Sequence, residues 1–408
     1  MQKFRLAHVL WAVAFGLVFL LLPSSITTPS QYGNTVFAVG LGVDKSDDDT
    51  QLSLSAQIVA AKPNATSSDS YQIVSADGVD IVEAIENMRK QIGKLLGLSH
   101  CYVVVVSDDV CNEYNLATLF DPLVRTERLG TNTILAHTNK KAKDLLLACE
   151  EIGGDAQNVL ESLTKYNYEY MLNKDASLYD FYKDYLAPHS TGLVVTIDSE
   201  EQSATQNSSG RQSQNNDNGS QSENTMPKHK IQNPGKGVAF YNGKKVADVT
   251  TDILQGLGWM ENSSKFNVIK LENINTQNLH NACVTLKQTD SNLNFKASIN
   301  NNIPTLYITL NIKAKVVSIK NDDLISTSDL NRYFDESFEQ ALQNLVYTQC
   351  DNACEFQRTN NIDILNFYKI FNTQIHNKWQ NYLNTLDNPK EYASKIQVFV
   401  NSHLIQVN

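Results

Sequence analysis

The sequence lacks the residue patterns that would identify an enzyme or a nucleic-acid-binding protein. It contains no glycine-rich phosphate loop, no nucleophile elbow and no metal-binding triad. It has no cluster of basic residues, and its formal net charge is −10. Proteins that bind nucleic acid concentrate Lys and Arg, so the sequence argues against nucleic acid as a partner. We expect no catalytic, cofactor-binding or metal-binding residues, and a function that depends on binding and on conformational transmission.

Cysteine is also scarce, because 408 residues contain six. Their irregular spacing is not typical of a disulfide scaffold. Cys350 and Cys354 lie four residues apart, with Asp351 and His376 nearby in sequence. A zinc site needs four convergent ligands, and a disulfide between these two positions would strain a helix. We therefore interpret Cys350 and Cys354 as partly buried side chains.

One long hydrophobic run is present, at the N-terminus. Lys3 and Arg5 precede the apolar segment Val9 to Leu22, which ends at Pro23. The pattern is typical of a secretory signal or of a short uncleaved membrane helix, and either would export the rest of the chain. A buried core helix is the alternative, but this segment has no polar face. Because no small-residue cleavage site follows the segment, we favour an uncleaved anchor over residues 1–34.

Residues 35–198 show the periodicities of an α/β domain. We expect a hairpin, then helices and strands in alternation, with Asn139 as a helix cap. Asp44, Ser46, Asp48 and Thr50 imitate half of a calcium-binding loop, but Asp49 and Ser55 replace its Gly and Glu, so we expect a solvated turn. The expected elements are strands Thr35–Asp44, Gln51–Val59, Tyr102–Val106, Leu129–His137 and Gly192–Asp198, and helices Gly78–Lys90, Asn139–Ala148 and Tyr179–Leu186.

Residues 199–234 change in composition to Ser, Asn and Gln, which predicts a disordered linker. A second domain should then occupy residues 235–408. It begins with a hairpin whose turn is Asn242-Gly243. The expected elements that follow are a helix from Thr251, strands Cys283–Thr289, Leu293–Ile299, Leu306–Ile319 and Lys395–Val407, and a long helix Leu324–Cys350. The fold class is therefore α+β and multi-domain, with mixed sheets flanked by helices after the N-terminal segment.

Several short motifs follow one another along the chain in a fixed order. They comprise Gly78, Glu83, Ala84, Ile85, Arg89 and His100, then Arg125, Glu127 and Arg128, then Lys141, Ala142, Leu145 and Leu146, then Gly237, Ala239, Phe240, Lys244, Gly256 and Trp259, and then Asp363, Ile364, Phe367, Phe371 and Trp379. In this order the motifs resemble the Ger(x)C family, the C subunit of germinant receptors in spore-forming bacteria. The Arg-to-Glu spacing at Arg125 and Glu127 is one residue shorter than in the family pattern.

The resemblance implies a non-enzymatic subunit at the outer face of the spore inner membrane, in complex with integral membrane subunits A and B. Family members typically carry a lipid on a Cys after the apolar run; here the first cysteine is Cys101, so no lipid attachment is expected. The alternative is an extracytoplasmic envelope enzyme or solute-binding protein. His100 could act as a base in such an enzyme, but no nucleophile or carboxylate accompanies it at motif spacing. Glu83, Arg89 and Arg128 are interpreted as solvated or ion-paired residues.

Overall fold

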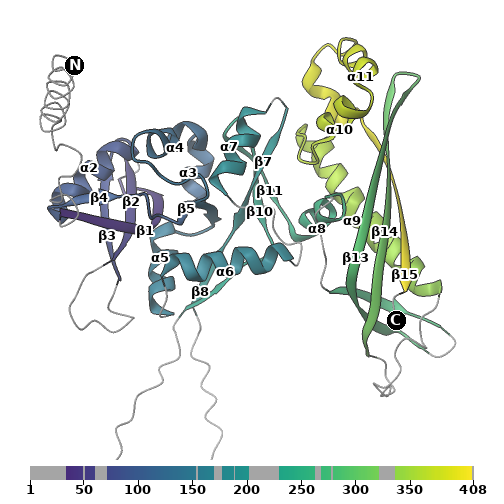
Figure 1. The fold of residues 1–408 in the computed structure, drawn as a ribbon, viewed down its shortest axis with the longest axis horizontal. Helices are drawn as coiled ribbons and strands as arrows, with labels where there is room; N and C mark the ends of the chain where they lie inside the picture. Colours follow the sequence, from purple (N-terminus) through teal and green to yellow (C-terminus); the bar gives the residue numbers. More distant parts are fainter. Residues whose placement is uncertain are drawn as a thin grey trace, which may run out of the picture.

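The computed structural model describes residues 34–48, 51–59, 71–152, 155–169, 177–187, 189–201, 229–261, 268–276, 279–320 and 336–406. The predicted membrane segment and most of the predicted linker lie outside these ranges. Two lobes, each built around a β-sheet, follow one another along the long axis of the molecule (Figure 1). The expected α+β class with mixed sheets and flanking helices is confirmed.

The first lobe is a mixed sheet whose centre is parallel. Strand β1 pairs in parallel with β5, which continues in parallel through β6 to β7. The antiparallel strands β2 and β3 follow β1 on one side, and β10 and β11 follow β7 on the other. The strands are β1 (Thr35–Lys45), β2 (Leu52–Val59), β3 (Tyr71–Gly78), β4 (Leu95–Gly97, beside β1), β5 (Val103–Ser107), β6 (Ile134–Thr138), β7 (Thr191–Thr196), β10 (Gly237–Tyr241) and β11 (Lys244–Val249).

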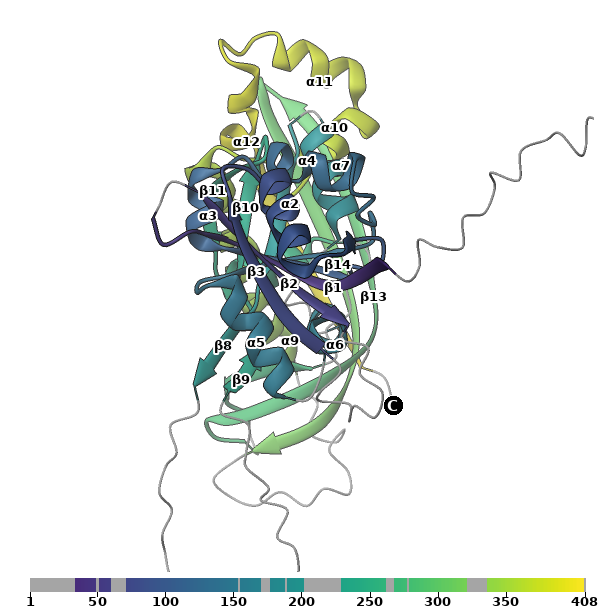
Figure 2. The same cartoon turned by 90° about the vertical axis from the view of Figure 1, so that its left-hand side faces the viewer.

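Helices cover both faces of this sheet, which explains the uninterrupted apolar run of β5. Val104 and Val106 pack with the helices of one face, and Val103 and Val105 with those of the other. Figures 1 and 2 show these two layers on either side of the strands. The helices of the first face are α2 (Ile81–Ile92), α3 (Asp108–Glu113), α4 (Leu116–Arg125) and α7 (Leu178–Leu186), and those of the second are α5 (Ala142–Glu151) and α6 (Ala156–Glu169).

Two expected helix starts were wrong. Helix α2 begins after the cap Asp80 rather than at Gly78, so Ile81 and Ile85 point inward while Val79 is exposed. Helix α5 begins at Ala142, and the side chain of Asn139 does not cap it. Both errors arise because the apolar spacing alone does not say which polar residue supplies the cap.

The second lobe is a four-stranded sheet with helices on one face. Its order is β12-β13-β14-β15, and the last pair is parallel. Strand β13 runs unbroken through two bulges, where we expected two strands, and β12 was not expected at all. The elements are β12 (Ile269–Ile274), β13 (Ala282–Asn300), β14 (Ile303–Lys320), β15 (Gln397–Gln406), α8 (Thr251–Trp259), α9 (Glu336–Asn360), α10 (Phe367–Gln374), α11 (His376–Leu383), the short helix η4 (Pro389–Glu391) and α12 (Tyr392–Lys395).

The hairpin β10–β11 belongs to the first sheet, although its residues follow the expected domain boundary at 235. Its turn residues Asn242 and Gly243 both have positive φ, as a two-residue hairpin turn requires. The carbonyl of Gly243 accepts the backbone N–H of Leu116 at 2.8 Å, which attaches the turn to α4. Strands β8 (Asp198–Glu201) and β9 (His229–Gln232) also pair inside the expected linker range. The linker over 199–234 otherwise stays a prediction.

Candidate functional site between the two lobes

Helix α8 joins the lobes, because it follows β11 directly and packs in the core of the second lobe. Gly256 lies against α9 so closely that a Cβ atom would sit 2.1 Å from the carbonyl oxygen of Gln349. Only glycine fits at this contact. Trp259 donates its indole N–H to the Gln349 side chain at 2.6 Å, and Gln349 in turn donates to Gln255. Two residues of the family resemblance, Gly256 and Trp259, therefore fix the packing of α8 on α9.

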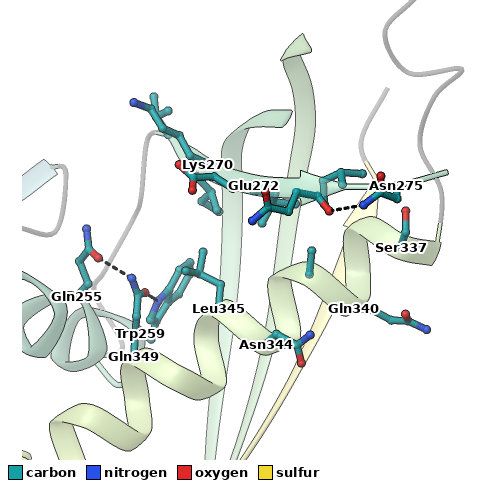
Figure 3. A pocket seen from close by; sticks show the side chains of 16 residues that line it. Gln255, Trp259, Lys270, Glu272, Asn275, Ser337, Gln340, Asn344, Leu345 and Gln349 are labelled. Atoms are coloured by element: carbon teal, nitrogen blue, oxygen red, sulfur yellow. Dashed lines mark hydrogen bonds between the residues drawn. The ribbon is translucent and has the colours of Figure 1, made fainter. Parts of the chain in front are cut away.

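A pocket of about 950 Å³ opens beside this contact, between α8, β12 and the first half of α9. Figure 3 shows the Gln255–Gln349–Trp259 hydrogen bonds at one end of it and Ser337 at the other. Apolar side chains such as Leu345 lie between them, and the amine of Lys270 points away. Carboxamides and hydroxyls both donate and accept hydrogen bonds without a charge. The end formed by Gln255 and Gln349 therefore suits a neutral polar ligand, and the ionisable side chains in the lining are Lys270 and Glu272 on β12.

The two lobes also meet at a buried tyrosine. The Tyr392 hydroxyl donates to Asp363 at 2.7 Å, and Asp363 accepts the backbone N–H groups of Phe367 and Tyr368 at the start of α10. Burial, together with the Asp363 charge, raises the pKa of Tyr392 far above its usual range. The same hydroxyl lies 3.4 Å from the backbone carbonyl of His189, a residue of the first lobe. With its pKa raised, Tyr392 keeps its one hydroxyl proton at neutral pH and donates it to Asp363, while the same oxygen lies beside the first lobe.

Aromatic rings continue this junction into the second lobe. The His189 ring stacks on Tyr368 at 4.6 Å, and Tyr368 meets the buried Trp379 edge-on at 6.1 Å. Burial, and then the nearby charge of Lys390, lower the pKa of His189, so its ring is neutral at physiological pH. A cavity of about 510 Å³ lies alongside, between α7 and α10. Charged side chains of both signs line it, including Asp184 and Lys369.

A second polar cluster lies at the carboxyl edge of the parallel strands. The buried ring of His137 contacts Asp108 at 3.1 Å and Thr196 at 3.0 Å. Lys245 of β11 also binds Asp108, at 2.6 Å. Burial lowers the pKa of His137; burial alone would raise the pKa of Asp108, but Lys245 and His137 outweigh it and lower that pKa. His137 is only 1% exposed and Asp108 is 32% exposed, and through Lys245 the cluster ties β11 to the sheet.

Asp44 supplies the cap of α5. Its carboxylate accepts the backbone N–H groups of Ala142 at 2.7 Å and Lys143 at 3.0 Å, and burial raises its pKa. Its two oxygens thus serve a helix N-terminus, where a negative charge is favourable. The segment that imitates half of a calcium-binding loop also includes Asp49 and Thr50, which lie outside the described residues. In the described part of the chain, no group of three or more His, Cys, Asp or Glu is placed to hold a metal ion.

The residues singled out in the sequence have structural partners. Asp80 caps α2 by accepting the backbone N–H of Glu83 at 2.8 Å, and the Glu83 side chain accepts the backbone N–H of Val79, the residue before the cap, at 2.8 Å. Arg89 forms an ion pair with Glu127, which joins two of the motif segments. His100 is exposed and meets Phe37 edge-on at 4.7 Å. None of these arrangements places a nucleophile beside a base.

The remaining sequence candidates are Arg128, Cys350 and Cys354. Arg128 adopts a left-handed backbone conformation, with φ at 58°. Both cysteines are free and buried on α9, so burial is more complete than expected. Burial raises the pKa of Cys354 to about 12 and that of Cys350 well above its usual value. Both thiols are therefore protonated and unreactive at neutral pH.

Among the described residues, none of the helices combines the length and the apolar character that a membrane span requires. Sequence reasoning missed both the lobe junction and the His137 cluster. A usable signal existed for the cluster, because polar residues follow three neighbouring parallel strands. No comparable signal existed for the junction, whose partners lie up to 203 residues apart in the chain.

Two family models match the chain in consecutive order. The model described as the spore germination protein N-terminal domain matches residues 31–199, and the one described as spore germination B3/GerAC like, C-terminal, matches residues 236–407. None of the curated proteins matches the sequence. A solved structure titled "Crystal Structure of the GerBC protein" is similar over 90% of this chain and 97% of that chain, with 14% identity and a TM-score of 0.48.

Proposed function

Because the chain belongs to the GerAC family of spore germination proteins, we propose that it is the non-enzymatic, membrane-anchored C subunit of a germinant receptor. In this role it assembles with the integral membrane subunits A and B at the outer face of the spore inner membrane. Its apolar segment Val9 to Leu22 is the anchor in place of a lipid. The observation that carries the proposal is the match of both family domains, in order, over most of the chain.

The geometry of the junction supports a role in transmission rather than catalysis. A single residue, Thr250, separates β11 of the first sheet from α8 of the second lobe. Gly256 then fixes α8 on α9, and the Tyr392 hydroxyl, which donates to Asp363, lies against the His189 carbonyl of the first lobe. A displacement of one lobe therefore strains a packed contact in the other, because close-packed interfaces change between discrete arrangements. A subunit with this junction between its lobes can couple nutrient detection by its partner subunits to later steps of germination.

A deletion strain tests this function. Spores that lack the protein should fail to respond to particular nutrients, yet germinate by a route that bypasses nutrient sensing. Re-introduction of the parent chain should restore the response, and His100→Ala should restore it equally well. Spores that keep every nutrient response after the deletion would contradict the proposal.

The membrane anchor is tested separately by fractionation. The full-length protein should sediment with membranes, and mass spectrometry should find the segment Val9 to Leu22 intact and without a lipid. A mature N-terminus between Ser24 and Gly33 in the soluble fraction would show a cleaved signal instead.

The pocket beside α8 favours one variant of the alternative function, a solute-binding protein. Equilibrium dialysis of the protein with neutral polar solutes would detect such binding. A solute that binds the parent protein, and that Leu345→Trp excludes from the pocket, would support this second function. A turnover assay on envelope substrates in which His100→Ala folds normally but loses all activity would instead indicate an enzyme.

A further inference from the structure

The second sheet has one covered face and one exposed face. Side chains such as Leu306 and Ile308 alternate inward, and they pack against the helices of the second lobe. The side chains that alternate with these inward residues along the strands point outward and are mostly exposed. In Figure 1 the helix α9 lies on one side of β13, β14 and β15. We call this second surface the outer face. It comprises the exposed residues Lys270, Lys287, Asp290, Lys296, Tyr307, Lys313, Lys315, Phe399, His403 and Ile405, together with the polar residues between them.

The outer face is basic, although the chain carries a net charge of −10. It carries five lysines and two acidic residues, which are Glu272, two residues from Lys270 on β12, and Asp290, which pairs with Lys313 at 3.3 Å. Lys287 and Lys315 are register partners on β13 and β14, so two cations stand directly opposite each other. Like charges in this position destabilise a sheet unless a counter-charge lies nearby. The arrangement therefore favours an anionic surface placed over these two strands.

An exposed aromatic pair lies on the same face. Tyr307 and Phe399 are register partners on β14 and β15, and their rings stack at 5.4 Å with 16° between the planes. Tyr307 is 42% exposed and Phe399 is 53% exposed. Lys296 of β13 is the register partner of Tyr307, so a cation flanks the pair. Exposed aromatic side chains flanked by cations are typical anchors of protein interfaces.

We propose that the outer face is the docking surface for an acidic protein surface of a partner subunit, with the Tyr307–Phe399 pair as its apolar anchor. The inference rests on the proposed function, since it assigns a partner-binding surface to a receptor subunit. Charge complementarity selects the occupant. A second copy of this chain, stacked face to face, would bring the same lysines together and is disfavoured by their repulsion.

Photo-cross-linking in native membranes tests this surface. The photoreactive residue p-benzoyl-L-phenylalanine replaces Phe399 in the full-length chain, and in a control chain it replaces Tyr347, which is 57% exposed on α9. Charge is tested with Lys287→Glu combined with Lys315→Glu. The matched control combines Lys94→Glu with Lys244→Glu, two exposed lysines of the first lobe, and changes the net charge equally. All variants should melt at the temperature of the parent protein, because every substituted side chain is exposed.

The expected result is one discrete protein adduct from position 399 and none of that mass from position 347. Peptide mapping should place the cross-link in an acidic segment of the partner. Charge reversal by Lys287→Glu and Lys315→Glu should lower the yield of the adduct about tenfold or more. The control pair, Lys94→Glu and Lys244→Glu, should leave this yield unchanged. Salt should lower the yield as well, because exposed charges are screened.

Four outcomes would overturn the proposal: no adduct, an adduct that both reversal pairs affect equally, an adduct of two copies of this chain, or cross-links to lipid alone. The germination assay separates these failures from failure of the proposed function. A deletion that abolishes the nutrient response, combined with no adduct at position 399, would refute the docking surface and leave the receptor role in place. A deletion without effect would refute the receptor role itself.

Discussion

The contact between α8 and α9 makes Gly256→Ala a sensitive test of the lobe junction. The new Cβ would lie 2.1 Å from the Gln349 carbonyl oxygen and 2.9 Å from the Cβ of Ala353. The first neighbour is backbone, so the clash is relieved only if the two helices separate. Overpacking of this kind costs up to about 3 kcal/mol, and the better helix propensity of Ala returns about 1 kcal/mol. We therefore expect Gly256→Ala to destabilise the second lobe by about 2 kcal/mol.

Thermal unfolding followed by calorimetry measures this change. For a lobe of this size, the destabilisation corresponds to a fall in Tm of about 4–8 °C. Gly130→Ala is the matched control, because its added Cβ would meet no atom closer than 3.6 Å. If Gly256→Ala melts like the parent protein, α8 does not pack on α9 as described. Spores carrying Gly256→Ala should also respond more weakly to nutrients than spores carrying Gly130→Ala.

Three further predictions concern single side chains. Trp379→Ala should destabilise the second lobe by about 3–5 kcal/mol in the same calorimetry, because the ring is fully buried, and Trp379→Phe should cost less. Glu83→Ala should cost about 1 kcal/mol through the lost hydrogen bond to the Val79 N–H, and His100→Ala close to nothing; a larger cost for His100→Ala would contradict the roles given to these two side chains. Because the pKa of His137 is lowered below 6.5, the unfolded chain takes up a proton that the folded chain resists as pH falls below 6.5. Stability should therefore decrease with falling pH in that window, and His137→Asn should flatten this dependence in urea unfolding; an unchanged slope would refute it.

Apolar periodicity predicted several elements of the first lobe, among them β1, β2, β5, α2 and α7, but β3, β4 and α6 were not predicted. Its β5 run is buried on both faces, and its helices bury one stripe each, so the two patterns differ clearly. The cap of α5 could not be read in the same way. Asp44 precedes the helix by 98 residues, and only the parallel pairing of β1 with β5 brings it there.

The second lobe was harder to predict because its strands are long and only half buried. Residues 290–292 separate the two expected strands, yet β13 continues through them in register with β14, directly after the bulge between Gln288 and Asp290. Strand β12 was missed because its short alternating pattern carries polar residues at every exposed position. Weak alternation in an edge strand cannot be distinguished from a loop without the neighbouring strand.

The hairpin β10–β11 shows why the domain division could not be placed from composition alone. The change to Ser, Asn and Gln before residue 235 marks where the chain leaves the first sheet, but the chain then returns to it for two more strands. Lys245 binds Asp108 there, and the hairpin turn is bonded to α4, so the start of β11 is fixed on the first lobe, while its last residue, Val249, pairs with Gly237 of β10. The chain enters α8 one residue after this fixed strand. The segment that connects the two lobes is therefore too short to flex. A partner that moves one lobe must either move the other lobe as well or break the contact between Gly256 and α9.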